Sequence, residues 1–156
     1  MSVSNGKFHN VNSLSELQTY HVGVIEAAAH RALRQHKDSL LKGYDLTGVE
    51  WYIIGTVADA GTSGIRTTDL ANILGTTLGF LTKTIALLEA KDYLFKKANA
   101  EDARSSFICF NEKKRKVIDE IEIALRVKLR ESIYDQVSPE ELMTYIKVMQ
   151  KFSQIK

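Results

Sequence analysis

The chain has 156 residues, of which 44% are hydrophobic, with nine glycines and a single proline. This composition indicates a folded, mainly helical protein of one domain, or of one domain with a dimerising extension. The net charge of +2 is too small to identify a nucleic acid or another partner from charge alone. Cys109 is the only cysteine, which excludes an internal disulfide and suits a reducing cytosol.

Membrane and secretion signals are missing from the sequence. No apolar run approaches the roughly 20 residues that a membrane-spanning helix needs. The opening segment MSVSNGKFHN lacks the apolar core of a secretory signal. We therefore expect a cytoplasmic protein whose residues 1–12 are disordered.

Two capping boxes predict the first two long helices. Ser13 and Glu16 form the first box, and the helix after it is expected to run to about Lys37. A heptad-like stripe follows along this helix: Leu14, Leu17, His21, Val24 and Ala28. Thr47 and Glu50 form the second box, with Leu46 and Trp51 as a hydrophobic staple.

Residues 65–94 contain two short helical patterns joined by a tight turn, which is typical of a helix-turn-helix. Thr67 and Thr68 offer caps to the first helix, Gly75 ends it, and Thr76 or Thr77 caps the second. The second helix has an apolar stripe that we expect to be buried: Leu78, Leu81, Ile85 and Leu88. Its opposite face is centred on Lys83 and has few carboxylates, so this face can approach a phosphate backbone.

The C-terminal half begins with a predicted β-hairpin. Short β-prone runs at 93–95 and 107–110 flank the polar segment 98–105, and a hairpin directly after a helix-turn-helix is a wing. A long amphipathic helix follows from Asn111, and Ser138 with Pro139 starts a last helix. The first and last helices are too apolar to be lone arms, so we expect two copies to cover them in a two-fold homodimer.

The expected fold is therefore mainly α with a small β-hairpin. It consists of a winged helix-turn-helix domain with N- and C-terminal dimerisation helices. The expected boundaries are 1–12 for the disordered N-terminus, 13–43 for the N-terminal dimerisation helix, 44–110 for the winged helix-turn-helix, and 111–156 for the C-terminal dimerisation helices.

Three segments resemble the MarR family of bacterial winged-helix transcription regulators. They are Leu46-Thr47-x-x-Glu50-Trp51, the run from 78 to 91, and Asp102-Ala103-Arg104 in the wing. The resemblance extends from about residue 14 to 152, and residues 92–97 also resemble SarA-type regulators. It implies a homodimeric, sequence-specific regulator, more often a repressor, that binds a pseudo-palindromic operator in double-stranded DNA.

Two positions depart from the family pattern. Asp92 stands where the family usually has a glycine in a left-handed conformation, which aspartate tolerates better than most residues. Ala103 stands where the family often has arginine, which should weaken DNA binding by the wing.

The candidate DNA contacts lie on the helix-turn-helix and the wing. Lys83 is expected to contact a guanine edge or a phosphate, and Arg104, oriented by Asp102, a narrow minor groove. The full set is Arg66, Thr67, Thr76, Thr77, Gly79, Phe80, Thr82, Lys83, Lys96, Lys97, Asp102 and Arg104. The alternatives are a solvated lysine for Lys83, a surface ion pair for Arg104, and packing against a neighbouring element for Phe80 in place of a thymine methyl contact.

The resemblance also implies a small aromatic or phenolic effector. Its expected contacts are Tyr20, His21, Tyr44 and Trp51, although ordinary core packing explains Trp51 equally well. We expect no metal, because His21 has no second ligand at i+4, and no cofactor or enzyme activity, because no phosphate-binding loop or His/Cys constellation occurs. The alternative function is a winged-helix module that binds protein and not DNA, which the low net charge and Ala103 favour.

Overall fold

The computed structural model describes residues 13–99 and 106–155. Its α-helices and strands are α1 (Thr19–Leu41), α2 (Gly48–Asp59), β1 (Ile65–Arg66), α3 (Thr67–Leu74), α4 (Leu78–Ala90), β2 (Leu94–Ala98), β3 (Ser106–Phe110), α5 (Arg115–Ser132) and α6 (Pro139–Phe152). Short 3-10 turns occur at η1 (Leu14–Glu16), η2 (Lys42–Tyr44), η3 (Gly61–Ser63), η4 (Glu112–Lys114) and η5 (Tyr134–Gln136). The expected mainly α fold with a β-hairpin is confirmed.

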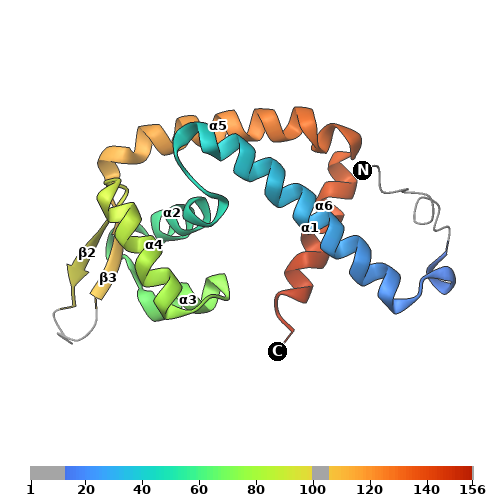
Figure 1. Cartoon of the computed structure of the whole chain (residues 1–156), viewed down its shortest axis with the longest axis horizontal. Coiled ribbons are helices and arrows are strands. Elements are labelled where there is room, and N and C mark those ends of the chain that lie inside the picture. The colour runs from blue at the N-terminus through green and yellow to red at the C-terminus, as the bar shows by residue number, and fades with distance from the viewer. Residues whose placement is uncertain (1–12, 100–105, 156) are drawn as a thin grey trace.

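A head domain at one end of the molecule contains α2, α3, α4 and the sheet, while α1, α5 and α6 extend away from it (Figure 1). The core of the head is formed by α2, α3, α4 and the sheet, together with the adjoining ends of α1 and α5. Its fully buried side chains include Leu41, Ile53, Ile54, Leu70, Leu81, Ile85, Leu88, Ile108 and Ile121. Each such side chain contributes about 1.5–3 kcal/mol when it leaves water, so this core fixes the positions of the short helices α3 and α4.

The sheet has three antiparallel strands in the order β1-β3-β2. The predicted hairpin is present, with Leu94 opposite Phe110 and Lys97 opposite Phe107. The short strand β1, which pairs Ile65 with Ile108, was not predicted. Two residues are too few to show a strand periodicity, so only the pairing partner reveals this strand.

Two of the predicted helix starts are confirmed in detail. In α2, the Glu50 amide donates to the Thr47 hydroxyl at 3.2 Å and the Thr47 amide donates to the Glu50 carboxylate at 2.8 Å. In α6, Ser138 and Glu141 form the equivalent pair of bonds, and Pro139 is the first helical residue. These signals depend on residues only three positions apart, so they do not depend on the rest of the fold.

Two other predicted starts were wrong. Residues 14–16 form only a 3-10 turn, and α1 begins at Thr19 after an extended Gln18, whose amide donates to the His21 ring at 3.3 Å. α1 also continues to Leu41, beyond the expected end near Lys37, because Leu41 is fully buried in the core of the head. In α3, the N-cap is Arg66 and not a threonine, and its guanidinium cannot cap the helix because it has no hydrogen-bond acceptor.

The burial of α4 differs from its expected apolar stripe at one end. Leu81, Ile85 and Leu88 are buried, but Leu78 is 49% exposed and Thr84 is buried in its place. At about 100° of rotation per residue, Leu78 lies roughly 70° from the mean direction of the buried residues. The packed face is therefore centred on Leu81 and Leu88.

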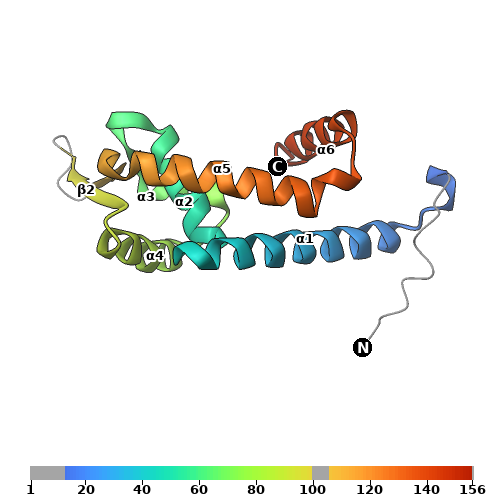
Figure 2. The ribbon, with the colours of Figure 1, turned by 90° about the horizontal axis from the view of Figure 1, so that it is seen from above.

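The helices outside the head leave large apolar faces uncovered within residues 13–99 and 106–155. α6 contains no buried residue, and in α1 only Leu41 is buried. Figure 2 shows α1 and α5 side by side, and the ring of His36 is joined to the hydroxyl of Ser132 at 2.6 Å. The exposed apolar side chains include Val22, Val24 and Ile25 in α1, and Tyr145, Ile146, Met149 and Phe152 in α6.

Candidate nucleic-acid interface

Helices α3 and α4 have the geometry of a helix-turn-helix. Three residues, 75–77, connect them, and the two helices are bent by 108°. This angle lies within the range of about 90–120° that is usual for the motif. Gly75 ends α3 with φ 59°, and the Thr76 amide then donates to the Ala71 carbonyl at 3.0 Å. The expected glycine end of α3 is thus confirmed, and the turn aims the start of α4 away from the core.

No single helix in the described parts of the chain is long and apolar enough to span a membrane. Only α3 and α4 taken together reach that length and composition, and the bend of 108° separates them. Leu70, Ala71, Leu81 and Ile85 on these helices are core residues of the head.

The threonines of α4 already hold hydrogen bonds within the helix. Thr77 is the N-cap, because its hydroxyl accepts from the Phe80 amide at 3.3 Å. The hydroxyl of Thr82 donates to the Leu78 carbonyl at 2.8 Å. Thr82 can therefore accept a further hydrogen bond, but donation to a phosphate would require this bond to break. Thr67 and Thr76, in contrast, are half-buried at the start of α3 and in the turn.

The outward face of α4 has one cation between two apolar side chains. Phe80, Lys83 and Leu87 follow each other at helical spacing and are all exposed, as is Gly79 beside them. Within the described residues no ion pair holds the Lys83 ammonium. Lys83 is therefore available to an anionic partner.

The wing places two further cations on one face of the sheet, one on each side of Phe107. Arg66 in β1 and Lys97 in β2 are both directly opposite Phe107 in β3. Residues paired across an antiparallel sheet project from the same face, with about 4.8 Å between strands. Arg66 also lies over the Phe107 ring, with 5.7 Å between its guanidinium carbon and the ring centroid. The structure thus brings these two predicted contacts together on one surface.

Lys96 has a different environment from Lys97. Its ammonium lies 2.8 Å from the Glu89 carboxylate, which joins β2 to α4. This ion pair balances the charge of Lys96 and leaves it less available to a phosphate than Lys97. The remaining predicted contacts of the wing, Asp102 and Arg104, lie outside the described residues.

The end of α4 is held by an ion-pair cluster that the sequence analysis missed. Lys91, the C-cap of α4, lies 3.1 Å from the Glu50 carboxylate and 3.5 Å from that of Asp45, and it also donates to the Asp45 carbonyl. Burial lowers the pKa of Lys91, but the hydrogen bonds and charges of Glu50 and Asp45 outweigh it, so its pKa is raised. The capping box revealed the role of Glu50 in α2, but no local signal reveals a partner 41 residues away.

The next residue, Asp92, has φ 64°. The expected left-handed exit from α4 is therefore confirmed. Asp45 has the same conformation with φ 56° and was not predicted. Aspartate adopts this region more readily than most residues.

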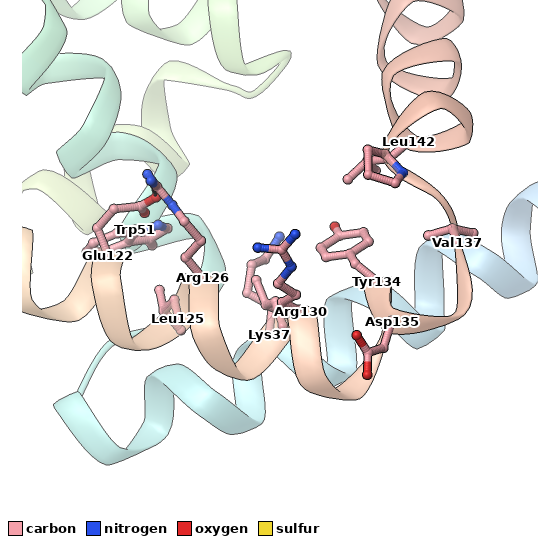
Figure 3. Close-up of a pocket in the computed structure, with 12 residues that line it drawn as sticks. Lys37, Trp51, Glu122, Leu125, Arg126, Arg130, Tyr134, Asp135, Val137 and Leu142 are labelled. Atoms are coloured by element: carbon pink, nitrogen blue, oxygen red, sulfur yellow. Dashed lines mark hydrogen bonds and ion pairs between the residues drawn. The ribbon is translucent and has the colours of Figure 1, made fainter.

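A cavity of about 500 Å³ lies between the helices of the head and those outside it. Trp51, Leu125, Leu129 and Leu142 give it apolar walls, and Lys37, Arg126 and Arg130 add positive charge, with Glu122 and Asp135 at its edges. Figure 3 shows Lys37 and Arg130 in its middle, between Trp51 and Tyr134. Burial is the main reason that the pKa of Lys37 is lowered. The ammonium of Lys37 also lies 4.1 Å from the centroid of the Tyr52 ring.

A second cavity of about 530 Å³ shares part of its lining with the first and reaches the helix-turn-helix. Both cavities are lined by Lys37, Leu129 and Tyr134, and the second also by Thr76 and Phe80. A molecule bound here would touch both α1 and the turn before α4.

Of the four predicted effector contacts, the structure brings only Trp51 to either of these two cavities. Tyr20 and His21 lie at the start of α1, roughly 24 Å along the helix from Lys37 at about 1.5 Å per residue. Tyr44 lies in η2. Among the described residues, no group of three or more His, Cys, Asp or Glu side chains could hold a metal ion.

Residues 44–105 match the sequence model of the MarR family. Over this segment the chain is similar to the MarR family. No protein with a curated description is recognisably similar in sequence.

Solved MarR-family structures share the fold over most of the chain. AbsC from Streptomyces coelicolor is 18% identical, with a TM-score of 0.72 over 88% of this chain and 95% of its own. A mutant of E. coli MarR, complexed with operator DNA, is 16% identical, with a TM-score of 0.74 over 84% of this chain and 92% of its own. Sco3205 from S. coelicolor, in complex with DNA, is 18% identical, with a TM-score of 0.76 over 92% of each chain.

Proposed function

We propose that this protein is a homodimeric, sequence-specific DNA-binding transcription regulator that acts as a repressor, and not an enzyme. The observation that carries the proposal is the outward face of α4, where Lys83 is exposed and free of ion pairs among the described residues. The wing cations Arg66 and Lys97 lie on the same winged domain and can bind phosphates. The structures of E. coli MarR and Sco3205 with DNA support this use of the fold.

The uncovered apolar faces of α1 and α6 support the homodimer. Exposed patches of this kind mark interaction surfaces, and two-fold dimers are the commonest closed assemblies. Two recognition helices related by such an axis would contact a pseudo-palindrome with half-sites about 10 to 10.5 bp apart. The regulator would act in the compartment that holds the DNA, in agreement with the expected cytoplasmic location.

The cavity beside Trp51 supports control by a small aromatic or phenolic effector. Its apolar walls suit a ring, and Lys37 and Arg130 suit a phenolate or carboxylate on that ring. Because the second cavity reaches the turn before α4, an occupant of both could shift α4 relative to α1. We therefore assign the effector to Trp51, Lys37 and Arg130, and not to Tyr20, His21 or Tyr44, which do not line either cavity.

The proposal can be tested by selecting bound fragments from a random DNA pool with the whole protein. We expect a shared pseudo-palindrome, and an affinity for it that falls roughly a thousandfold or more between about 50 and 200 mM salt. Fluorescence anisotropy measures both the affinity and its salt slope. A winged-helix module that binds protein would return no shared sequence, and that result would contradict the proposal.

A further inference from the structure

The outward face of α4 has unusual chemistry for a helix that contacts bases. The structure describes all of α4, and its exposed residues are Leu78, Gly79, Phe80, Thr82, Lys83, Ala86, Leu87 and Ala90. Arginine, asparagine and glutamine are missing from this set. Guanine is commonly bound in a bidentate manner by arginine or lysine, and adenine by asparagine or glutamine. This face can therefore supply at most one strong polar base contact, from Lys83.

Two large apolar side chains flank that lysine. Phe80 is 47% exposed and Leu87 is 56% exposed, and both follow the helical spacing of Lys83. The buried stripe of Leu81, Ile85 and Leu88 is on the other side of the helix, so Leu87 has no role in the core. Phe80 lines part of the second cavity and is about half exposed.

An exposed apolar group has one main partner in the major groove of DNA. The C5-methyl group of thymine is the only apolar group that a base pair presents there. Phe80 and Leu87 are seven residues apart, which corresponds to about 10.5 Å along the helix at about 1.5 Å per residue. That distance matches about three base pairs at roughly 3.4 Å per step.

We propose that Phe80 and Leu87 contact thymine methyl groups about three base pairs apart, on either side of the base pair or phosphate that Lys83 binds. The inference rests on the proposed DNA-binding function and names the feature of the operator that gives specificity. Each half-site then has two thymines whose methyl groups contribute to affinity.

Replacing thymine with deoxyuridine tests this directly, because it removes only the C5-methyl group. The duplex is the one recovered from the random pool, and each thymine of a half-site is replaced in turn. Loss of one buried methyl is worth about 0.8 kcal/mol, so we expect a roughly fourfold weaker Kd at each of two positions. Deoxyuridine at thymines outside the half-sites should leave the Kd unchanged.

Two variants assign the positions to side chains. In Phe80→Ala, the difference in Kd between the thymine and the uracil duplex should vanish at one position. In Leu87→Ala, it should vanish at the other. Ile73→Ala is the matched control, because Ile73 is 63% exposed but lies in α3, away from Phe80 and Leu87. This variant should retain the Kd difference between thymine and uracil at both positions. Phe80 and Leu87 are both exposed, so neither substitution removes a core contact. A thermal melt of each variant verifies that it is folded.

Each contradicting result has a separate meaning. If the protein binds its selected operator but no deoxyuridine substitution weakens binding, the thymine contacts are wrong while the DNA-binding function stands. The same holds if Phe80→Ala and Leu87→Ala bind more weakly yet keep the full difference between thymine and uracil. If the pool returns no shared sequence, the proposed function itself fails.

Discussion

Glu50 and Lys91 join the first turn of α2 to the last turn of α4. One oxygen of the Glu50 carboxylate accepts from the Thr47 amide at 2.8 Å, and the other lies 3.1 Å from the Lys91 ammonium. Glu50 is only 5% exposed, so its carboxylate is largely shielded from water. Glu50, which completes the capping box of α2, therefore also fixes the end of the helix that carries Lys83.

Replacing Lys91 with methionine should destabilise the protein. The change keeps most of the side-chain stem but leaves the buried Glu50 carboxylate without its cation, at a cost of about 1–3 kcal/mol. Urea unfolding followed by circular dichroism measures the loss. Lys97→Met is the matched control, because Lys97 is exposed on the wing, and it should stay within about 0.5 kcal/mol of the wild type.

The contribution of Lys91 should also depend on pH in a defined direction. Its pKa is raised above the ordinary value of 10.5 in the folded state. The stabilisation is thus fully present below about pH 10.5 and is lost as the pH rises through the higher folded pKa. The stability difference between the wild type and Lys91→Met should be equal at about pH 7 and pH 9 and smaller above about pH 11. An equal difference at all three values would argue against the ion pair.

Lys83→Ala and Lys97→Ala should affect DNA binding differently. Loss of a base contact by Lys83 is expected to weaken binding to the selected operator by about tenfold or more and to relax its sequence preference. Loss of a phosphate contact by Lys97 should weaken binding to all sequences alike and lower the salt slope by about 1. Anisotropy titrations on the operator and on a scrambled duplex separate the two cases. Unchanged operator affinity in Lys83→Ala would refute its assignment.

Gly64 and Gly55 should respond in opposite directions to substitution by alanine. Gly64 has φ 71° and ψ −176°, and a Cβ there would lie 2.7 Å from the Ile108 carbonyl oxygen. This backbone region is essentially restricted to glycine, so Gly64→Ala should cost at least about 1–3 kcal/mol and weaken the pairing of β1. Gly55 is exposed within α2 with nothing within 4 Å of its would-be Cβ, so Gly55→Ala should stabilise by about 0.5–1 kcal/mol. Thermal melts of the two variants show whether each substitution lowers or raises the melting temperature.

Phe152→Glu should weaken the proposed dimer. Phe152 is 59% exposed on the apolar face of α6, and burying a side chain of this size contributes about 1.5–3 kcal/mol. A two-fold interface contains the substitution twice, so the dimer Kd should rise by roughly a hundredfold or more. Lys147→Glu introduces the same side chain on the opposite face of α6 and should leave the Kd nearly unchanged. Sedimentation over a concentration series measures both, and equal behaviour of the two variants would exclude this face from the interface.

Local signals in the sequence determined where several elements begin and end. The capping boxes at Thr47 and Ser138, the glycine end of α3 and the left-handed Asp92 each depend on bonds within three or four residues of the chain. Such bonds form in the same way in any fold that accepts the element, so the sequence alone predicts them. The Lys83 face was predicted for the same reason, because helical spacing fixes which residues share a side.

Tertiary structure alone decided the features that need a distant partner. The strand β1 forms because residues 65–66 pair with β3, where Ile65 lies opposite Ile108. Lys91 forms its ion pair because the fold brings Glu50 of α2 next to the end of α4. Leu78 is exposed and Thr84 buried because the packing of α4 against α2 and α3 sets the centre of its buried face. The cavity at Trp51 likewise depends on how α1, α5 and α6 pack against the head. Spacing along the chain therefore does not predict whether Tyr20, His21 or Tyr44 lines it. Packing contacts join residues by their distance in space, and a linear sequence records only their distance along the chain.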